Sequence, residues 1–241
     1  MLPSVVQRYW DSQLSGDKLL ADSATLRLAL SHTLPENRRL ILLSGIDGRC
    51  RVVLDQALAS ALGDDLASCR SEADLRARLQ ALGLQLHGAD QLFYWPEAAR
   101  EALRLSAASA AQSGIRQLSE ADSDAFADFQ AEASDEDLDA AFVELDHRAV
   151  FGAFDDQGRL RCAASAYSWD DAPLADLGVL SLPAARGRGL ARSVLRALAA
   201  HAWEQGLVPQ YRCQLDNAAS LALARAAGLQ AYGQWDVLEA E

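Results

Sequence analysis

The spacing of apolar residues is most regular in the C-terminal half of the chain. Residues 174–182 are mostly apolar on both faces of an extended chain, which predicts a central strand that is covered on both sides. The spacing then changes to a helical stripe formed by Leu190, Val194, Leu195, Leu198 and Ala202. Residues 207–215 alternate between two faces and predict another strand. A helix capped by Asp216 or Asn217 follows, and Gly228 closes it before a last strand at 229–238.

Shorter elements are expected earlier in this half. They are a strand at 115–118, helices ending at Phe129 and covering 136–145, and strands at 150–154 and 160–167. Ser119 and Asp122 resemble a capping box, with Asp in place of Glu, and mark the start of the first helix. Helices and strands therefore alternate through this region.

The N-terminal part of the chain predicts a mixture of helices and strands with less regular order. We expect helices at 4–14, 55–62 and 72–82, strands at 39–44 and 50–54, and a further element over 84–95, whereas 26–30 suits either a helix or a strand. The small residues around 105–114 indicate a linker or a frayed helix end. We divide the chain into a domain at 1–108, a linker at 109–114 and a domain at 115–241.

Composition narrows the classes of function. The formal net charge of −12 disfavours a nucleic-acid role, because an acidic protein repels the phosphate backbone. No apolar run reaches the roughly 20 residues that a membrane span needs, and the N-terminus predicts no signal peptide. Four cysteines lack metal-ligand spacing, so we expect free thiols, no metal and a cytoplasmic location. Lys18 is the one lysine among 22 basic residues, which is typical of a GC-rich bacterial genome.

The segment 186–191 carries the clearest candidate chemistry. A strand ends at Pro183 and a helix begins within Arg186-Gly187-Arg188-Gly189, so the glycines allow a tight turn and a close approach of the backbone to a ligand. The first amides of a helix have no partner within it and favour an anion, above all a phosphate. A Rossmann motif is disfavoured because Arg192 stands where its third glycine would fall, and no Walker loop is present.

Two motifs in chain order resemble the GNAT acyltransferase family. Arg186-x-x-Gly189-x-Ala191 resembles the (Q/R)xxGx(G/A) signature, and Asn217-Ala218-Ala219-Ser220 with Gly228-Leu229 resembles the second signature. The resemblance covers about 115–241. It implies an α/β (α+β) fold with a GNAT-like mixed central sheet flanked by helices. The N-terminal part shows no such match, so we expect a smaller α+β domain of unknown role there, with a degenerate copy of the same fold as an open alternative.

The resemblance implies a role for each matched position. The backbone of Val179, Leu180 and Ser181 would bind the pantetheine arm of acetyl-CoA. The pyrophosphate would lie on the loop formed by Arg186, Gly187, Arg188, Gly189, Leu190 and Ala191. Asn217 and Ser220 would lie near the pantetheine and the thioester sulfur. The acetyl group would pass directly to an amine of a small molecule or a peptide, without a covalent enzyme intermediate.

Proton transfer needs further groups, because a free alkylamine is mostly protonated at neutral pH. Asp176, just upstream of the thioester segment, is the first candidate base, and Glu144 and His147 are reserves. Many relatives place a tyrosine as general acid where this chain has Ala224, so Ser220, Tyr211 or solvent would have to serve. Aromatic residues that could line an acceptor pocket are Tyr167, Trp169 and Trp235, although such residues are usually core.

Other interpretations stay open. Without the tyrosine, the chain could be a non-catalytic module that binds or senses acyl-CoA, or a structural protein that acts through its N-terminal domain. The acidic stretch from Glu120 to Asp139 could attract a cationic acceptor, but a solvated helix face is the favoured interpretation. We expect acyl-CoA and an amine as partners, a possible homodimer, and no membrane or nucleic-acid partner.

Overall fold

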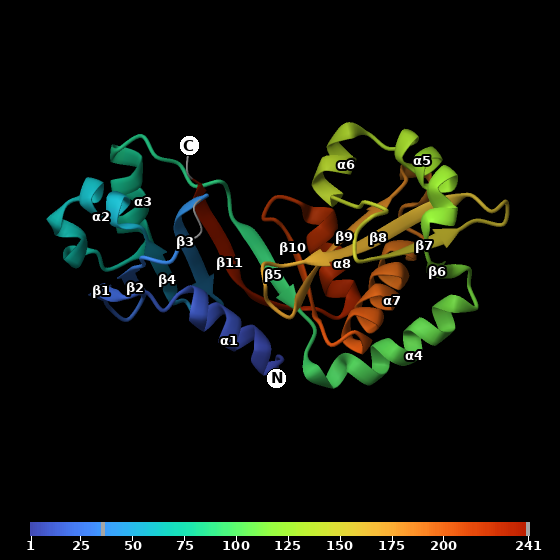
Figure 1. The fold of residues 1–241 in the computed structure, drawn as a ribbon, viewed down its shortest axis with the longest axis horizontal. Coiled ribbons are helices and arrows are strands. Elements are labelled where there is room, and N and C mark those ends of the chain that lie inside the picture. The colour runs from blue at the N-terminus through green and yellow to red at the C-terminus, as the bar shows by residue number, and fades with distance from the viewer. Residues whose placement is uncertain (35–36, 240–241) are drawn as a thin grey trace. The chain divides into compact units, whose positions relative to one another are not determined.

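The computed structural model describes residues 1–34 and 37–239, and its internal contacts divide the chain into two compact units. The first unit comprises 1–6, 94–212 and 218–230, and the second comprises 7–93, 213–217 and 231–241. Each unit combines a mixed sheet with helices, and Figure 1 shows the elements. The fold class expected from the sequence is therefore confirmed.

The sheet of the first unit has the strand order β10-β9-β8-β7-β6. Its strands are β6 (Ile115–Gln117), β7 (Ala149–Phe154), β8 (Leu160–Ser168), β9 (Leu174–Ser181) and β10 (Val208–Gln214). Pairing is antiparallel from β6 to β9, whereas β9 and β10 are parallel. A parallel pair needs a crossover connection, and α7 (Leu190–Glu204) supplies it.

Helices cover both faces of this sheet, as the alternation along β7 shows. Val150 packs with Phe126 and Phe129 of α5 (Ser123–Ala131), in a cluster that also holds residues of α6 (Asp135–Ala141). The next residue, Phe151, lies against His201 of α7, with ring centroids 5.5 Å apart. Successive strand residues point to opposite faces, so α5 and α6 cover one face and α7 covers the other. The helix α4 (Arg100–Ala111) packs on α7, and α8 (Ala218–Ala227) also contacts α7.

The second unit has the strand order β1-β2-β4-β3-β11-β5. These strands are β1 (Lys18–Asp22), β2 (Leu26–Leu30), β3 (Arg38–Gly45), β4 (Cys50–Leu54), β5 (Asp90–Tyr94) and β11 (Gln230–Glu239). A leucine-rich core joins the sheet to α2 (Gln56–Leu62), the 3-10 helix η1 (Asp64–Ser68) and α3 (Glu72–Ala81). The last strand of the chain, β11, pairs antiparallel with β3, with Trp235 opposite Leu43.

Most expected elements form, and the differences have local causes. The segment 26–30 is a strand, and α1 (Ser4–Gln13) is a helix as expected. The helix expected over 136–145 ends at Ala141, because Phe142 adopts a left-handed conformation (φ 46°) that stops it. Within 84–95 only β5 is a strand, and neither β1 nor the full length of α4 was expected. The domain division at 109–114 stays a prediction.

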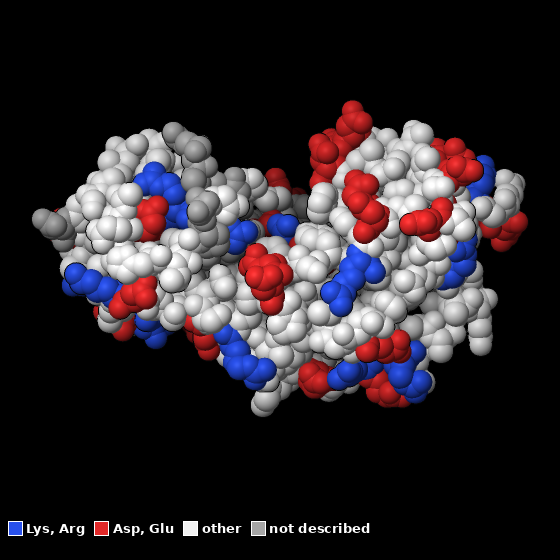
Figure 2. Space-filling view, viewed as in Figure 1, with Lys and Arg blue, Asp and Glu red and all other residues white. Residues whose placement is uncertain are grey.

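Three short 3-10 helices complete the element list: η2 (Glu97–Ala99), η3 (Glu120–Asp122) and η4 (Pro183–Ala185). The capping box expected at Ser119 and Asp122 forms at the start of η3. Acidic side chains gather over α5 and α6 on the face seen in Figure 2. In the described ranges, no helix has both the length and the apolar character needed to cross a membrane.

Candidate active site

The strands β9 and β10 pair over only part of their lengths. Their register runs from Leu174 opposite Val208 to Leu177 opposite Tyr211, and β9 then continues to Ser181. On its other edge β9 stays paired with β8 as far as Ser181. The backbone of residues 178–181 therefore extends beyond the β9–β10 ladder, where an extended ligand can add to the edge of β9.

The loop after β9 turns sharply into α7. Gly187 and Gly189 have φ values of 74° and 79°, a region that disfavours any residue with a Cβ. Gly189 is the N-cap of α7 without a side-chain cap, and the first helical bond that it accepts comes from Ser193, at 3.1 Å. The amides of the first turn, between Gly189 and Ser193, are thus left for solvent or an anion.

The two arginines of this loop differ in their surroundings. Arg186 donates to both carboxylate oxygens of Asp137 in α6, at 2.9 and 2.8 Å, and to the carbonyl of Ser181 at 3.2 Å. Its side chain is 51% exposed, so this ion pair is only partly shielded from water. Arg188 is exposed. Arg186 therefore links the loop to both β9 and α6.

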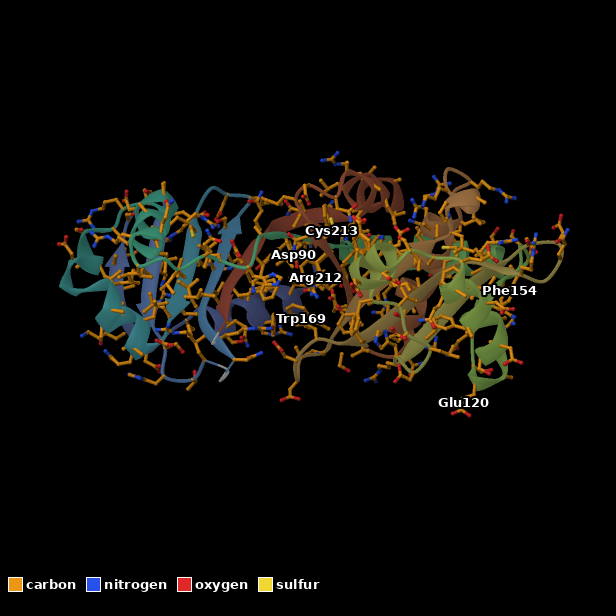
Figure 3. All side chains as sticks on the ribbon, turned by 90° about the horizontal axis from the view of Figure 1, so that it is seen from above. Asp90, Glu120, Phe154, Trp169, Arg212 and Cys213 are labelled. Atoms are coloured by element: carbon orange, nitrogen blue, oxygen red, sulfur yellow. The ribbon has the colours of Figure 1, made fainter. Side chains whose placement is uncertain are left out.

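Asp176 lies at the centre of a buried polar network and is 1% exposed. Its carboxylate accepts from Arg212 Nε at 2.7 Å, from the Tyr167 hydroxyl at 2.5 Å and from Gln210 Nε2 at 3.1 Å. Tyr94 donates to Gln210 in turn. The guanidinium of Arg212 also lies 5.1 Å from the ring of Trp169, and Figure 3 labels both residues. These donors satisfy the hydrogen-bonding capacity of the buried carboxylate.

His147 forms a second polar group on the same face of the sheet. Its Nδ1 lies 2.8 Å from the hydroxyl of Ser165, which is fully buried on β8, opposite Gly178 of β9. The ring packs against Phe142 and Tyr167, with centroids 5.0 and 5.2 Å away. Desolvation lowers the pKa of His147 below its ordinary value, against the charges of Asp146 and Glu144, so the imidazole is uncharged at neutral pH.

This region offers few side chains that could donate a proton as a general acid. Burial, and then the charge of Asp176, raises the pKa of Tyr167 well above its ordinary value, so the phenol remains protonated. Ala224 is fully buried in α8, whereas Ser220 lies in the first turn of that helix and Asn217 immediately precedes it. Burial also raises the pKa of the Cys162 thiol to about 12 and that of Cys213 to about 11, which opposes their action as nucleophiles.

The aromatic residues predicted for an acceptor pocket do not all belong to the same unit. Tyr167 and Trp169 both lie beside Arg212, whereas Trp235 lies in the second unit, where Arg38 stacks on its ring at 5.2 Å. Sequence reasoning missed Tyr94, Gln210 and Arg212 as parts of the Asp176 network. Three polar residues on one face of the strand predicted at 207–215, namely Gln210, Arg212 and Gln214, were the available signal. In the described part of the chain, no cluster of side chains has the composition of a metal site.

A comparison with known protein families identifies the family of the chain. The family model for GNAT acetyltransferases matches residues 84–238, so the chain belongs to the GNAT acetyltransferase family and is an N-acetyltransferase. A search of curated proteins gave no match. The match of the family model begins before the region of the two motifs and includes β5 and α4.

The comparison with solved structures gave matches of low sequence identity, and three of them are as follows. A GNAT-family acetyltransferase from Colwellia psychrerythraea is 19% identical over 70% of this chain and 63% of its own, with a TM-score of 0.47. The GNAT domain of the PAT protein of S. lividans is 18% identical over 51% and 89%, with a TM-score of 0.42. A ribosomal-protein-alanine N-acetyltransferase from Brucella melitensis is 22% identical over 52% and 99%, with a TM-score of 0.39.

Proposed function

We propose that the protein transfers an acetyl group from acetyl-CoA directly to an amine of a small molecule or a peptide. The observation that carries this proposal is the open edge of β9 at residues 178–181, next to the loop that starts α7. Acetyl-CoA has an extended pantetheine arm, which suits the open edge of β9. It also has a pyrophosphate, which suits the loop at the start of α7. The amide-forming step makes a carbon–nitrogen bond, breaks the carbon–sulfur bond and releases CoA as a thiol.

The donor would bind along the first unit. In the proposal, the backbone of Val179, Leu180 and Ser181 pairs with the pantetheine amides, as a strand added to the sheet. The pyrophosphate lies on the loop from Arg186 to Ala191, where the amides of the first helical turn and the charge of Arg188 favour it. Asn217 and Ser220, at the start of α8, remain our predicted contacts near the pantetheine and the sulfur.

The attacking amine must lose a proton, and two groups compete for it. Asp176, the base predicted from the sequence, is held by Arg212, so it can accept a proton only at the cost of that ion pair. His147 is uncharged at neutral pH, and its Nδ1 is fixed by buried Ser165 opposite Gly178, one residue before the predicted pantetheine segment. The geometry thus favours His147, with Asp176 holding Tyr167 and Arg212 in place.

The departing thiolate must gain a proton. Ser220 is our predicted donor from the sequence, and its place in the first turn of α8 keeps it near the motif residue Asn217. Buried Ala224 supplies no donor. A CoA thiolate is a tolerable leaving group, so protonation by solvent would also sustain turnover.

Thiol release from acetyl-CoA across a panel of amines tests the proposal. Spermidine, lysine, an alanine-terminated peptide and an aminoglycoside serve as probes of different amine classes. CoA release that depends on one of these amines would support the enzyme. Binding of CoA without release for any amine would favour the alternative, a non-catalytic acyl-CoA-binding module. No binding at millimolar CoA in a thermal-shift assay would overturn both.

The pH–rate profile then separates the two bases. A general base contributes about 10²–10⁴-fold to such a step. If His147 is the base, His147→Gln removes the fall in rate on the acid side, whereas Asp176→Asn keeps that limb. The reverse result would restore Asp176 as the base. An unchanged profile in both variants would exclude both groups, provided that their unfolding temperatures show folded protein.

The remaining parts of the proposal concern the setting of the enzyme. A cytoplasmic location in a bacterial cell would supply acetyl-CoA and a reducing medium, and four buried, unbridged cysteines suit such a medium. We propose no metal, nucleic-acid or membrane partner, and a homodimer stays a prediction. Fractionation of the native host and light scattering of the purified chain would test location and assembly.

A further inference from the structure

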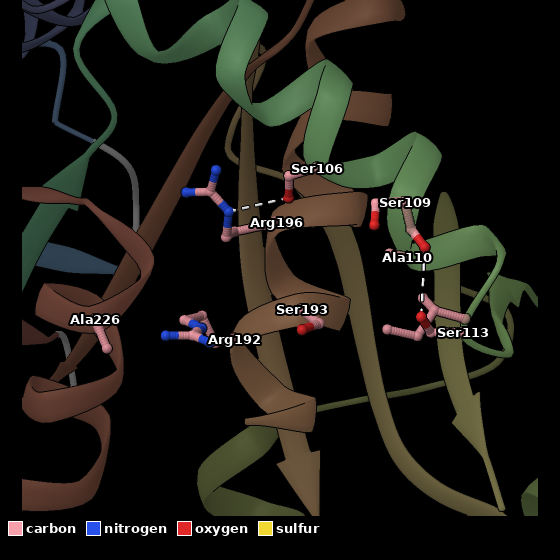
Figure 4. A pocket seen from close by; sticks show the side chains of 9 residues that line it. Ser106, Ser109, Ala110, Ser113, Arg192, Ser193, Arg196 and Ala226 are labelled. Carbon is pink, nitrogen blue, oxygen red and sulfur yellow. Dashed lines mark hydrogen bonds between the residues drawn. The ribbon is translucent and has the colours of Figure 1, made fainter. Parts of the chain in front are cut away.

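A pocket of about 370 Å³ lies within the first unit, away from the Asp176 network. Three helices line it, and α7 contributes residues from its first two turns. Its polar lining consists of Ser106, Ser109, Ser113, Arg192, Ser193 and Arg196. Figure 4 shows these side chains between α4, α7 and α8, with Ala226 on α8. The lining contains two cations, four hydroxyls and no carboxylate.

The side chains that line the pocket come together by helical spacing. Arg192 and Arg196 are four residues apart on α7, and Ser106 and Ser109 are three apart on α4, so each pair lies on one helix face. Arg196 fixes the helices relative to one another within this unit. Its Nε donates to Ser106 at 3.1 Å, and its Nη1 donates to the carbonyl of Ala227 at 2.7 Å. The shape of the pocket is therefore built by the fold itself.

The positive charge of the pocket is not neutralised. In the described ranges, no ion pair joins Arg192 or Arg196 to a carboxylate, and the hydrogen-bond partners of Arg196 are neutral. Burial, and then the charge of Arg192, lowers the pKa of Arg196 from its ordinary value. By contrast, the carboxylate of Asp155 raises the pKa of Arg161. In a chain of net charge −12, this pocket is a local positive site.

Arginine with surrounding hydroxyls is the donor set that suits a phosphate. A guanidinium donates two parallel hydrogen bonds to phosphate oxygens, and each serine adds a donor without adding charge. A phosphate monoester carries more charge than a carboxylate and presents three acceptor oxygens. The four serines and two arginines match such a group better than they match a carboxylate.

The position of Arg192 connects this pocket to the loop that begins α7. It is the third residue of α7, so its backbone lies in the turn whose amides face the predicted pyrophosphate, while its side chain lines the pocket. One helical turn rises about 5.4 Å, which is a short step between two phosphate groups of one molecule. CoA carries a phosphate monoester on its ribose in addition to the pyrophosphate.

We propose that the pocket between α4, α7 and α8 binds a phosphate monoester. Two sources have this chemistry, namely the ribose 3′-phosphate of CoA and a separate phosphorylated molecule. The first source rests on the proposed function, whereas the second does not. With either source α4 contributes to a ligand site, although it lies outside the two sequence motifs.

Calorimetry on the full chain with CoA and dephospho-CoA tests the first source, because the two ligands differ by this phosphate alone. CoA should bind at least about tenfold more tightly, a difference of about 1.4 kcal/mol. Arg192→Gln and Ser109→Asp should each weaken CoA binding to the level of dephospho-CoA and leave dephospho-CoA unchanged. Both sites are solvent-accessible, so neither change disturbs the core.

Matched controls make the comparison specific. Arg225→Gln removes the same charge from α8 at an exposed residue that does not line the pocket, and Ala108→Asp adds the same charge as Ser109→Asp to an exposed neighbour on α4. Both controls should keep the preference for CoA. In addition, the ³¹P resonance of the 3′-phosphate should shift on binding to the wild type and not on binding to Arg192→Gln.

The outcomes separate the two sources and the two proposals. CoA and dephospho-CoA could bind equally while the wild type binds inorganic phosphate or adenosine 3′,5′-bisphosphate and Arg192→Gln does not. That result would assign the pocket to a separate ligand. No preference for CoA and no phosphate binding would overturn the inference while leaving the proposed function intact. If neither CoA form binds, the proposed function fails, and the phosphate titration alone judges the pocket.

Discussion

At the scale of single residues, Arg186 has one observed partner and one predicted partner. Its guanidinium is bonded to Asp137, yet the sequence motif places it beside a pyrophosphate. An exposed ion pair of this kind contributes only about 0–1 kcal/mol, so a phosphate can compete for the same guanidinium. The charge of Arg186 therefore remains available to the loop even though the side chain has a partner.

The substitution Arg186→Glu should weaken CoA binding at least about tenfold and cost about 1 kcal/mol of stability, because it places a like charge against Asp137. Calorimetry and urea denaturation measure the two effects. Arg159→Glu is the matched control, since Arg159 has a comparably exposed pair with Asp155 at 3.1 Å in a hairpin turn. Equal CoA affinity in the two variants would remove Arg186 from the pyrophosphate site.

His147 predicts a pH dependence of stability whose sign follows from its lowered pKa. The folded state holds the imidazole neutral, while the unfolded chain binds a proton near the ordinary value of 6.5. Between the folded pKa and 6.5 the unfolded state binds more protons, so the free energy of unfolding falls as the pH falls below 6.5. The contribution is fully present above that value.

Comparison of the wild type with His147→Gln separates the contribution of His147 to the free energy of unfolding from that of other titrating groups. Urea denaturation at pH 7.5 and 5.5 should show a smaller acid loss in the variant. Ser165→Ala gives a second check, because it removes the partner of Nδ1 and leaves the ring in place. An identical loss for wild type and His147→Gln would mean that the imidazole is already as accessible to protons as it is in the unfolded chain.

At the scale of elements, the loop that starts α7 depends on glycine for its conformation. Replacing Gly187 (φ 74°) by Ala should cost about 1–2 kcal/mol, because the left-handed region is unfavourable for a residue with a Cβ. No heavy atom lies within 4 Å of the added carbon, so the cost is conformational rather than steric. The loop should relax away from this geometry and bind CoA more weakly.

Gly158 provides the control for this effect. It has nearly the same φ (75°), equally open surroundings and a place in the turn between β7 and β8. Gly158→Ala should therefore lose similar stability while keeping CoA affinity. Thermal unfolding measures the stability of both variants, and calorimetry measures their affinity for CoA. If Gly187→Ala leaves CoA affinity intact, the backbone of this loop is not part of the binding site.

The elements also show what a sequence can and cannot predict. The apolar stripe of α7 and the alternation of β10 could be predicted from the sequence, because each pattern is set within one segment by the face that packs. The network around Asp176 was not, because Tyr167, Gln210 and Arg212 meet only through strand register, which no single segment encodes. The pocket between α4, α7 and α8 could not be predicted for a related reason. Three of its four serines, Ser106, Ser109 and Ser113, stand in a small-residue stretch that indicates a linker as readily as a helix.

At the scale of the whole chain, the pairing of β11 with β3 bears on how the domains are divided. The C-terminal motifs suggest a domain at 115–241, yet β11 hydrogen-bonds along β3, from Gly233 opposite Gly45 to Glu239 opposite Arg38. Trp235, Val237 and Leu238 of β11 are at most 8% exposed. The last strand thus depends on residues from the beginning of the chain.

A truncated chain of residues 115–241 should therefore fail to fold as an independent domain. Loss of β3 leaves an apolar strand with an unpaired edge, which is a ready template for aggregation. We expect early elution on gel filtration and no cooperative thermal transition. Residues 1–114 supplied as a separate chain should restore soluble protein and CoA binding, because they return β3 to its partner. A monomeric truncated chain with a cooperative transition would instead show that 115–241 is a domain in its own right.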